Sequence, residues 1–404
     1  MNFKARLSRV QNRAPEATVE SGPPALSSLR KRIAEIELRG RNGCSAARCG
    51  APAPRSDDDA LARALTGHQV ADGLIRIAHR VPLDHRLGNV HLSSLQPQPK
   101  LPGELPEAAR RYFYLDTETT GLSGGSGTVA FLIGCAVVAQ DAIEVTQFLI
   151  TRFGAEPDML SAFADTLKAG DCLVSYNGKS YDVPLLSTRY RMHSMGQPFA
   201  AFAHLDLLHP VRRLFARRWH DCRLSSAERE LLGFGRVDDL PGSEAPAAWF
   251  GYVRSAISAP LIRTVQHNRQ DLVSLAVVHS VLGEAVTRPQ AFGVDLYALG
   301  RWLADHSEHQ ARHMLQANQH ALCEDGLRLL ANLWRRTGDW PQALRIWEAL
   351  AATGCTESLQ RLAKYHEHVS KDLDAAMRCC TQLSADAAHE RRRERLAIKL
   401  KRPR

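Results

Sequence analysis

The stretch at residues 112–127 constrains the fold of this chain more than any other. It reads Tyr-Phe-Tyr-Leu-Asp-Thr-Glu-Thr-Thr-Gly and continues into glycines and serines. Its aromatic and apolar start, residues 112–115, predicts a buried strand, and the side chains of a strand alternate between two faces. Asp116 and Glu118 therefore project from the same face. Neighbouring carboxylates repel each other and a divalent cation offsets that repulsion, so the pair is a candidate metal site, with solvated acids at a strand end as the alternative.

Three residues further along the chain extend this candidate site. Asp182 follows a second strand-like run, residues 172–176, and begins a predicted helix, so it is either a site acid or only a helix cap. His267 and Asp271 are four residues apart, a spacing that puts both side chains on one face of a helix. A histidine satisfied by a neighbour is the alternative for His267. With the first two acids, these three residues form the candidate catalytic set.

Small residues accompany the acids. Thr119, Thr120 and Gly121 follow the first pair directly, and Asn177 lies between the second strand-like run and the third acid. Small side chains let backbone N–H groups approach an anion, such as the phosphate or sugar of a chain end. We therefore take these four residues as candidate substrate-binding residues.

Taken in order, these motifs resemble the four-acid pattern of the DEDD 3′–5′ exonucleases of the ribonuclease H-like superfamily. A longer match, which includes Asp-Leu-Pro-Gly at residues 239–242 and His-Asn-Arg-Gln-Asp at residues 267–271, resembles the bacterial YprB-type branch over roughly residues 70–285. The resemblance implies an α/β domain with a mixed sheet flanked by helices. It also implies a metal-dependent nuclease that shortens nucleic acid from the 3′ end by a two-metal mechanism.

The resemblance assigns a role to each acid. Asp116 would bridge two Mg²⁺ or Mn²⁺ ions, Glu118 and Asp271 would complete one of them, and Asp182 would hold the other, partly through water. His267 would orient and deprotonate the attacking water, since its unperturbed pKa lies near neutrality. The histidine-type enzymes usually leave four residues between this histidine and the acid, whereas this chain leaves three, as the tyrosine-type enzymes do. The neighbouring asparagine, residue 268, or a water is therefore an alternative for the base.

Changes in composition and a proline-rich stretch divide the chain into five parts. Proline, arginine and serine enrich the start, four prolines lie in residues 96–106, and strand signals cease after about residue 290. The predicted parts are a disordered basic N-terminal region (1–60), a helix and strand lead-in with a proline-rich linker (61–106), the ribonuclease H-like exonuclease domain (107–288), a TPR-like helical domain (289–390) and a basic tail (391–404), which is either solvated or holds nucleic acid.

Apolar periodicity predicts the elements of the central part. Strands are expected at residues 73–81, 112–115, 128–138, 143–150 and 172–176, and helices at 157–170, 182–195, 205–215, 247–253 and 261–283. The second to fourth of these strands suggest an antiparallel start to the sheet. The helix expected at 205–215 begins a stretch rich in arginine, for which a solvated face is the first interpretation and a phosphate contact the second.

The C-terminal part reads as helical hairpins. Residues 330–350 and 359–383 each predict one hairpin, and the break at 337–343 recurs at 370–376, an offset of about 33 residues that is close to the tetratricopeptide period. Since two units are few for a stable solenoid, residues 291–322 are expected to form a third. An ordinary helical bundle is the alternative. If the repeats are real, we expect a protein partner on them.

The overall composition narrows the class of protein. The formal net charge of +9 over 404 residues favours an anionic partner such as DNA or RNA. Nine scattered cysteines, with no metal-ligand spacing to a histidine, argue against zinc and predict a reduced, cytoplasmic chain. No apolar run is long enough to span a membrane. Two other functions stay open from the residues alone: a nucleic-acid-binding scaffold that uses the helical repeats, and a structure-selective endonuclease.

Overall fold

The computed structural model describes residues 57–96, 101–103, 111–121, 127–384 and 386–401. The predicted basic N-terminal region lies outside the described residues up to position 56, and so does most of the proline-rich linker. None of the helices within the described ranges combines the length and the apolar character that crossing a membrane requires.

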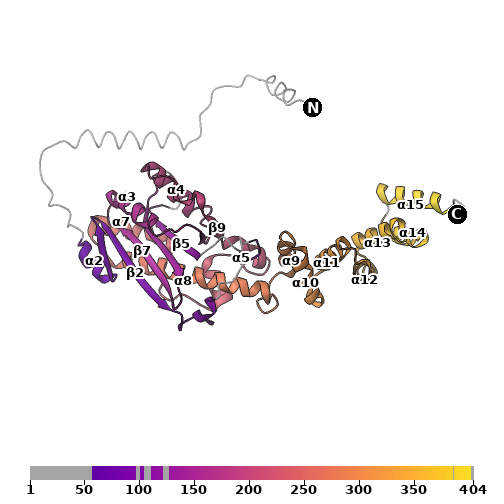
Figure 1. Ribbon diagram of the computed structural model, residues 1–404, viewed down its shortest axis with the longest axis horizontal. Helices are drawn as coiled ribbons and strands as arrows, with labels where there is room; N and C mark the ends of the chain where they lie inside the picture. The colour runs from indigo at the N-terminus through magenta and orange to yellow at the C-terminus, as the bar shows by residue number, and fades with distance from the viewer. Residues whose placement is uncertain (1–56, 97–100, 104–110, 122–126, 385, 402–404) are drawn as a thin grey trace, which may run out of the picture. The chain divides into compact units, whose positions relative to one another are not determined.

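A seven-stranded mixed sheet forms the centre of the fold, in the order β1-β2-β7-β6-β5-β8-β9 (Figure 1). Its strands are β1 (Gly67–Ala71), β2 (Leu74–Pro82), β5 (Arg111–Thr119), β6 (Ala130–Val138), β7 (Ala142–Ile150), β8 (Asp171–Ser175) and β9 (Ala203–Asp206). Strands β5, β6 and β7 are antiparallel, as predicted, whereas β5, β8 and β9 run parallel. The predicted class, an α/β domain with a mixed sheet, is confirmed.

Helices cover both faces of this sheet. Alternation along β5 sends Phe113 to one face, where its ring lies 6.0 Å from that of Phe163 on helix α3 (Glu156–Ala164). It sends Tyr114 to the other face, where the phenol lies 3.0 Å from His279 Nδ1 on helix α8 (Ala259–Thr287). Since Asp116 has the same parity as Tyr114, the first acid of the candidate site faces α8.

The predicted lead-in at 61–106 contributes strands to the same sheet. Helix α2 (Asp58–Ala64) is followed by the β1-β2 hairpin, and β2 pairs with β7 along its whole length. The first strand of this hairpin was not expected, because it is short and its residues are mostly polar and exposed. A two-stranded ladder, β3 (Arg86–Leu87) and β4 (Val90–His91), and the helical turn η3 (Leu92–Leu95) complete the segment.

The helix predicted at 205–215 was wrong in its first residues. The chain there forms β9, which ends at Asp206, and helix α5 starts only at Leu208 and runs to Phe215. A four-residue strand leaves too little alternation to separate it from the helix that follows, and parallel pairing with β8 decides its state. The remaining helices of this part are α4 (Asp182–Met192), α6 (Leu224–Ala227), the π-helical turn η6 (Glu228–Leu232) and α7 (Ala245–Ser255), with helical turns η4 (Phe153–Ala155), η5 (Pro198–Ala201) and η7 (Gly242–Glu244).

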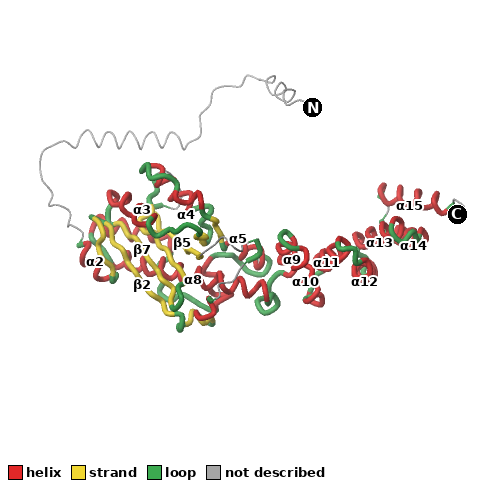
Figure 2. Tube along the Cα trace, viewed as in Figure 1, coloured by secondary structure: helices red, strands yellow, loops and turns green. Residues whose placement is uncertain are grey.

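The C-terminal part is helical throughout the described residues (Figure 2). Three hairpins follow one another: α9 (Leu296–Ala304) with α10 (Glu308–Ala317), α11 (Glu324–Arg336) with α12 (Trp340–Ala352), and α13 (Thr356–His368) with α14 (Leu373–Thr381). The turn η8 (Gln319–Ala321) separates the first two hairpins, and α15 (Ala387–Leu400) occupies most of the predicted basic tail.

The break that recurs in the last two hairpins has the same backbone conformation in both. Gly338 and Lys371 both adopt left-handed backbone angles, with φ of 80° and 58°. The residue that follows each, Asp339 or Asp372, caps the second helix of its hairpin through its side chain. Because the same turn and cap start both helices, the recurrence in the sequence reflects a repeated local structure.

The close packing of α8 on β6 depends on Gly134. A Cβ atom there would lie 2.1 Å from Asn268 Oδ1 and 2.7 Å from Leu272 Cδ1. We expect Gly134→Ala to lower the free energy of unfolding by roughly 1–3 kcal/mol, because α8 must move away from the sheet. Urea unfolding measures this. Gly251→Ala on α7 is the control, since a Cβ there meets no atom within 4 Å and alanine favours the helix. Equal losses in both variants would contradict the role given to Gly134.

Candidate active site

Strand β5 carries the first two carboxylates within its length. Asp116 is paired with Gly134 and Glu118 with Leu132 of β6, so the strand extends beyond the apolar run that predicted it. Both side chains lie on the face covered by α8, and that of Glu118 is buried. The prediction that the two acids share a face therefore agrees with the register of the strand.

The third acid stands at the start of α4. The N-cap of this helix is Tyr181, so Asp182 is the first helical residue and not the cap. The hydroxyl of Thr117 on β5 donates a hydrogen bond to Asp182 Oδ1, at 2.5 Å. This contact ties the third acid to the strand that carries the first two.

A buried acid that the sequence analysis had not singled out orders the turn before α4. Asp206, at the end of β9, is 2% exposed. Its Oδ1 accepts a hydrogen bond from the backbone N–H of Asn177 at 2.7 Å, and its Oδ2 accepts one from Lys179 N–H at 3.0 Å. Asn177 has a φ of 67°, so the turn is held in a conformation that few residues adopt. No pattern in the sequence indicated this role, because the strand that ends at Asp206 was predicted as the start of a helix.

Helix α8 supplies the other residues of the set. Between His267 and Asp271 it presents Asn268, whose side-chain amide donates to Asp116 Oδ2 at 2.7 Å and accepts from Gln147 Nε2 at 2.7 Å. Asn268 and Gln147 are both fully buried. The amide of Asn268 is thus engaged at both ends and orients the first acid of the site.

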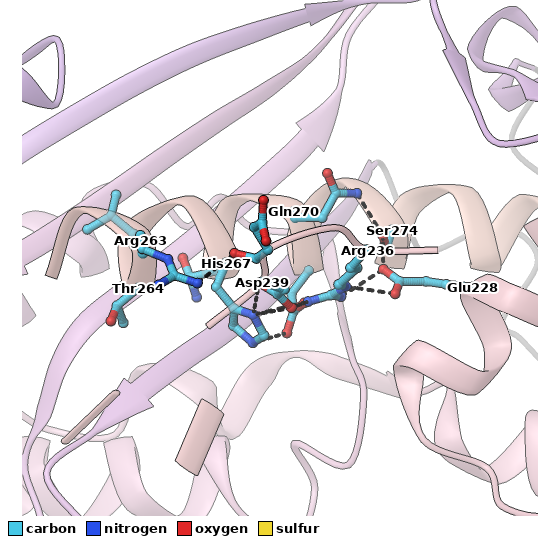
Figure 3. A network of polar contacts seen from close by, with 12 residues as sticks. Glu228, Arg236, Asp239, Arg263, Thr264, His267, Gln270 and Ser274 are labelled. Carbon is cyan, nitrogen blue, oxygen red and sulfur yellow. Dashed lines mark hydrogen bonds and ion pairs between the residues drawn. The ribbon is translucent and has the colours of Figure 1, made fainter. Parts of the chain in front are cut away.

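A group of charged side chains lies beside the end of this set (Figure 3). Arg236 Nε and Nη2 donate to the two oxygens of Glu228 at 2.8 and 2.7 Å, its Nη1 contacts Asp239 Oδ2 at 3.0 Å, and its Nη2 also pairs with Asp271. His267 Nδ1 lies 2.8 and 2.9 Å from the two oxygens of Asp239, while its Nε2 lies 3.6 Å from Asp271 Oδ2. Asp239 belongs to the Asp-Leu-Pro-Gly turn, for which the sequence predicted no function.

The four acids act on one another electrostatically. Burial raises the pKa of Asp116 well above its usual value, and the charges of Asp271, Asp182 and Glu118 raise it further. Burial and the charges of Asp271 and Asp182 likewise raise the pKa of Glu118. Burial raises the pKa of Asp182 to about 6 and also raises that of Asp271, against the opposing effect of Arg236. Such mutual coupling requires all four carboxylates to lie in one region of the fold.

The chemistry of this set fits a hard divalent cation. Four carboxylates without a thiol supply the oxygen ligands that Mg²⁺ and Mn²⁺ prefer. The raised pKa values of Asp116 and Glu118 reflect burial first and the neighbouring negative charges second. As the side chains lie, however, the described residues include no group of three or more histidine, cysteine, aspartate or glutamate side chains gathered closely enough to hold an ion. The cation beside Asp271 is instead the guanidinium of Arg236.

A cavity of about 740 Å³ opens beside the acids. Its lining includes Asp116 and Asp182 together with three of the candidate substrate-binding residues, Thr119, Gly121 and Asn177. The fourth, Thr120, does not line it. The backbone and hydroxyl of Thr120 bond to Val129, which closes the base of the loop between β5 and β6. The rest of that loop, residues 122–126, lies outside the described residues.

Comparison with known proteins agrees with the fold. The family model of the RNase H superfamily matches residues 113–282, which include all of α4 and most of β5 and α8. The chain is therefore a protein with an RNase H-like nuclease fold. The chain is also 32% identical over 305 residues to the uncharacterized protein YprB of Bacillus subtilis (strain 168), a match that covers 72% of this chain and 73% of the relative. The chain belongs to the YprB family of the RNase H superfamily, which confirms the resemblance found in its motifs.

The raised pKa of Asp182 gives a pH-dependent prediction. A carboxyl whose pKa is about 6 in the folded protein contributes stability below about pH 4 that is lost as the pH rises through 6. In chelator, we expect Asp182→Asn to be more stable than the native protein by roughly 2 kcal/mol at pH 8 and equal to it at pH 4. Urea unfolding at the two pH values measures the difference. Added Mg²⁺ should shrink the advantage at pH 8, and a less stable asparagine variant in chelator at pH 8 would contradict the account.

Proposed function

We propose that this chain is a metal-dependent nuclease that hydrolyses phosphodiester bonds, and that it acts as a 3′–5′ exonuclease with two Mg²⁺ or Mn²⁺ ions. The observation that carries the proposal is the convergence of four mutually coupled acids from β5, α4 and α8 beside a cavity of about 740 Å³. A domain of the RNase H superfamily supports the coarser statement, hydrolysis of nucleic acid. The direction and the metal stoichiometry are our own assignment.

The proposed roles follow from the position of each acid. Two bound cations would stabilise the attacking and the leaving oxygen of the phosphodiester at once. Asp116 would be the acid shared between them, since three other acids raise its pKa and Asn268 orients it. Glu118 and Asp271 would complete one ion site and Asp182 the other.

His267 is the proposed general base. Its Nδ1 is engaged with Asp239, so Nε2 is the nitrogen that can accept a proton from the attacking water. The engagement of Asn268 with Asp116 and Gln147 favours His267 over that asparagine for this role. In this reading, Thr119, Gly121 and Asn177 receive the terminal nucleotide in the cavity, and Thr120 holds the loop beside it.

A second candidate function comes from the helical part. Three consecutive hairpins form there, and a polar cavity of about 710 Å³ is lined by Arg328 of α11 and by Arg361 and Lys364 of α13. We propose that these TPR-like hairpins bind a protein partner.

None of the seven cysteines in the described part of the chain forms a disulfide, and we place the protein in the reducing cytoplasm on that ground.

The test is degradation of 5′-labelled single- and double-stranded DNA and RNA with Mg²⁺ or Mn²⁺. We expect a ladder that shortens from the 3′ end and disappears in chelator. Asp116→Asn and Asp271→Asn should abolish it, and His267→Ala should slow it by roughly 10²–10⁴-fold. Asp84→Asn is the matched control, because that acid is exposed and distant in sequence from the site.

Each alternative gives a different result. Cuts within the strand, sensitive to the same substitutions, would replace the exonuclease with an endonuclease. If no substrate is cut by the native protein but salt-sensitive binding is measured, catalysis is wrong as the main function and the partner of the hairpins becomes the object of study.

A further inference from the structure

The carboxylate of Asp239 and the imidazole of His267 form a pair outside the four acids of the site (Figure 3). Both oxygens of Asp239 lie within 2.9 Å of His267 Nδ1. An ionised carboxylate only accepts hydrogen bonds, so this contact requires the hydrogen on Nδ1. Arg236 Nη1, which can only donate, also lies 3.2 Å from Nδ1 and favours the other tautomer, but the two carboxylate contacts are shorter and favour hydrogen on Nδ1. Burial would raise the pKa of Asp239, but the hydrogen bonds and charges of His267 and Arg236 outweigh it and hold the pKa below its usual value. Asp239 is therefore an acceptor at neutral pH.

The end of the turn that carries Asp239 lies beside the other ring nitrogen. Gly242 ends this turn, and a Cβ atom there would lie 3.8 Å from His267 Nε2. With glycine at this position, residue 242 places no side chain against Nε2. The ring thus has one nitrogen fixed by a carboxylate and the other directed toward Asp271, at 3.6 Å from its Oδ2.

A buried ion pair holds Asp239 in place. Arg236 binds Asp239 at 3.0 Å and is itself held by both oxygens of Glu228, which is 1% exposed and also accepts from Ser274 on α8. The preceding residue in the turn is anchored as well, because Arg263 of α8 donates to the carbonyl of Asp238 at 2.7 Å. Helix α8 therefore carries the histidine and also anchors the turn that orients it.

We propose that Asp239 is a positioning residue for His267: it fixes the tautomer with hydrogen on Nδ1, and Arg236 with Glu228 fixes Asp239. The inference rests on the proposed function, in which Nε2 of His267 takes a proton from water. A network that only stabilised the fold would place no requirement on which ring nitrogen carries the hydrogen. In catalytic triads, changing the carboxylate beside a histidine to an amide leaves the geometry intact but favours the wrong tautomer.

The variant that tests this is Asp239→Asn in the full-length protein. An asparagine can donate its amide hydrogen to Nδ1, which moves the ring hydrogen to Nε2. We expect kcat to fall by about 10–100-fold, with KM and Mn²⁺ affinity within about threefold of the native values. Asp238→Asn is the matched control, since it removes the same charge from the neighbouring residue. The side chain of Asp238 is exposed, and asparagine tolerates its backbone φ of 52°.

The readout that does not depend on activity is the tautomer itself. Long-range ¹H–¹⁵N spectra of ¹⁵N-histidine-labelled protein, with His267 assigned by His267→Gln, should show hydrogen on Nδ1 in the native protein and on Nε2 in Asp239→Asn. Hydrogen on Nε2 in the native protein overturns the inference even if the variant does not fold. A native protein that cleaves and an Asp239→Asn variant that cleaves equally well overturn the inference but leave the proposed function standing. A native protein inert on every substrate overturns both, and the spectra then report on the pair alone.

Discussion

The repulsion between four buried or half-buried acids is the constraint on which the site depends. Taking a carboxylate out of water disfavours its ionised form, and each further carboxylate nearby adds to that cost. The fold answers with one local partner for three of the acids: the amide of Asn268 for Asp116, the hydroxyl of Thr117 for Asp182 and the guanidinium of Arg236 for Asp271. These contacts orient the carboxylates, yet the pKa values of all three stay raised. The local partners therefore do not fully offset the cost of ionising the four acids, and a divalent cation bound among them would stabilise their charged forms strongly.

The position of α8 decides whether the acids meet at all. Strand β5 and helix α8 are about 150 residues apart in sequence, and the direct contact between Asp116 and Asn268 joins them. That contact forms because Gly134 on the neighbouring strand leaves room for the asparagine, and because Gln147 on β7 holds its other end. Packing and function thus meet in the same side chain: the residue that seats α8 on the sheet also orients the first acid.

The sequence predicted the parts of the fold in which a single pattern determines the structure. The apolar strands, the long helix and the spacing of His267 and Asp271 all have strong periodic signals, and each agrees with the structure. What it missed depends on contacts between distant segments. The network of Glu228, Arg236 and Asp239 joins a π-helical turn, a loop and a glycine turn, none of which has periodicity. The short strand before α5 was missed for the same reason, because its pairing with β8 decides its conformation.

The arginine-rich stretch shows why charge alone is a weak guide to nucleic-acid binding. Arg213 lies over the ring of Trp302 at 5.3 Å and 3.8 Å from Asp305, and Arg217 lies 3.4 Å from Asp295. All three partners belong to α9 or its ends, and one apolar core runs from α8 into the first two hairpins. These two arginines therefore help to join α5 to the helical part, although the side chain of Arg217 stays 69% exposed. The net charge of +9 favours an anionic partner, but it does not say which basic side chains would meet it, and a phosphate can approach the acids of the site only when cations offset their charge.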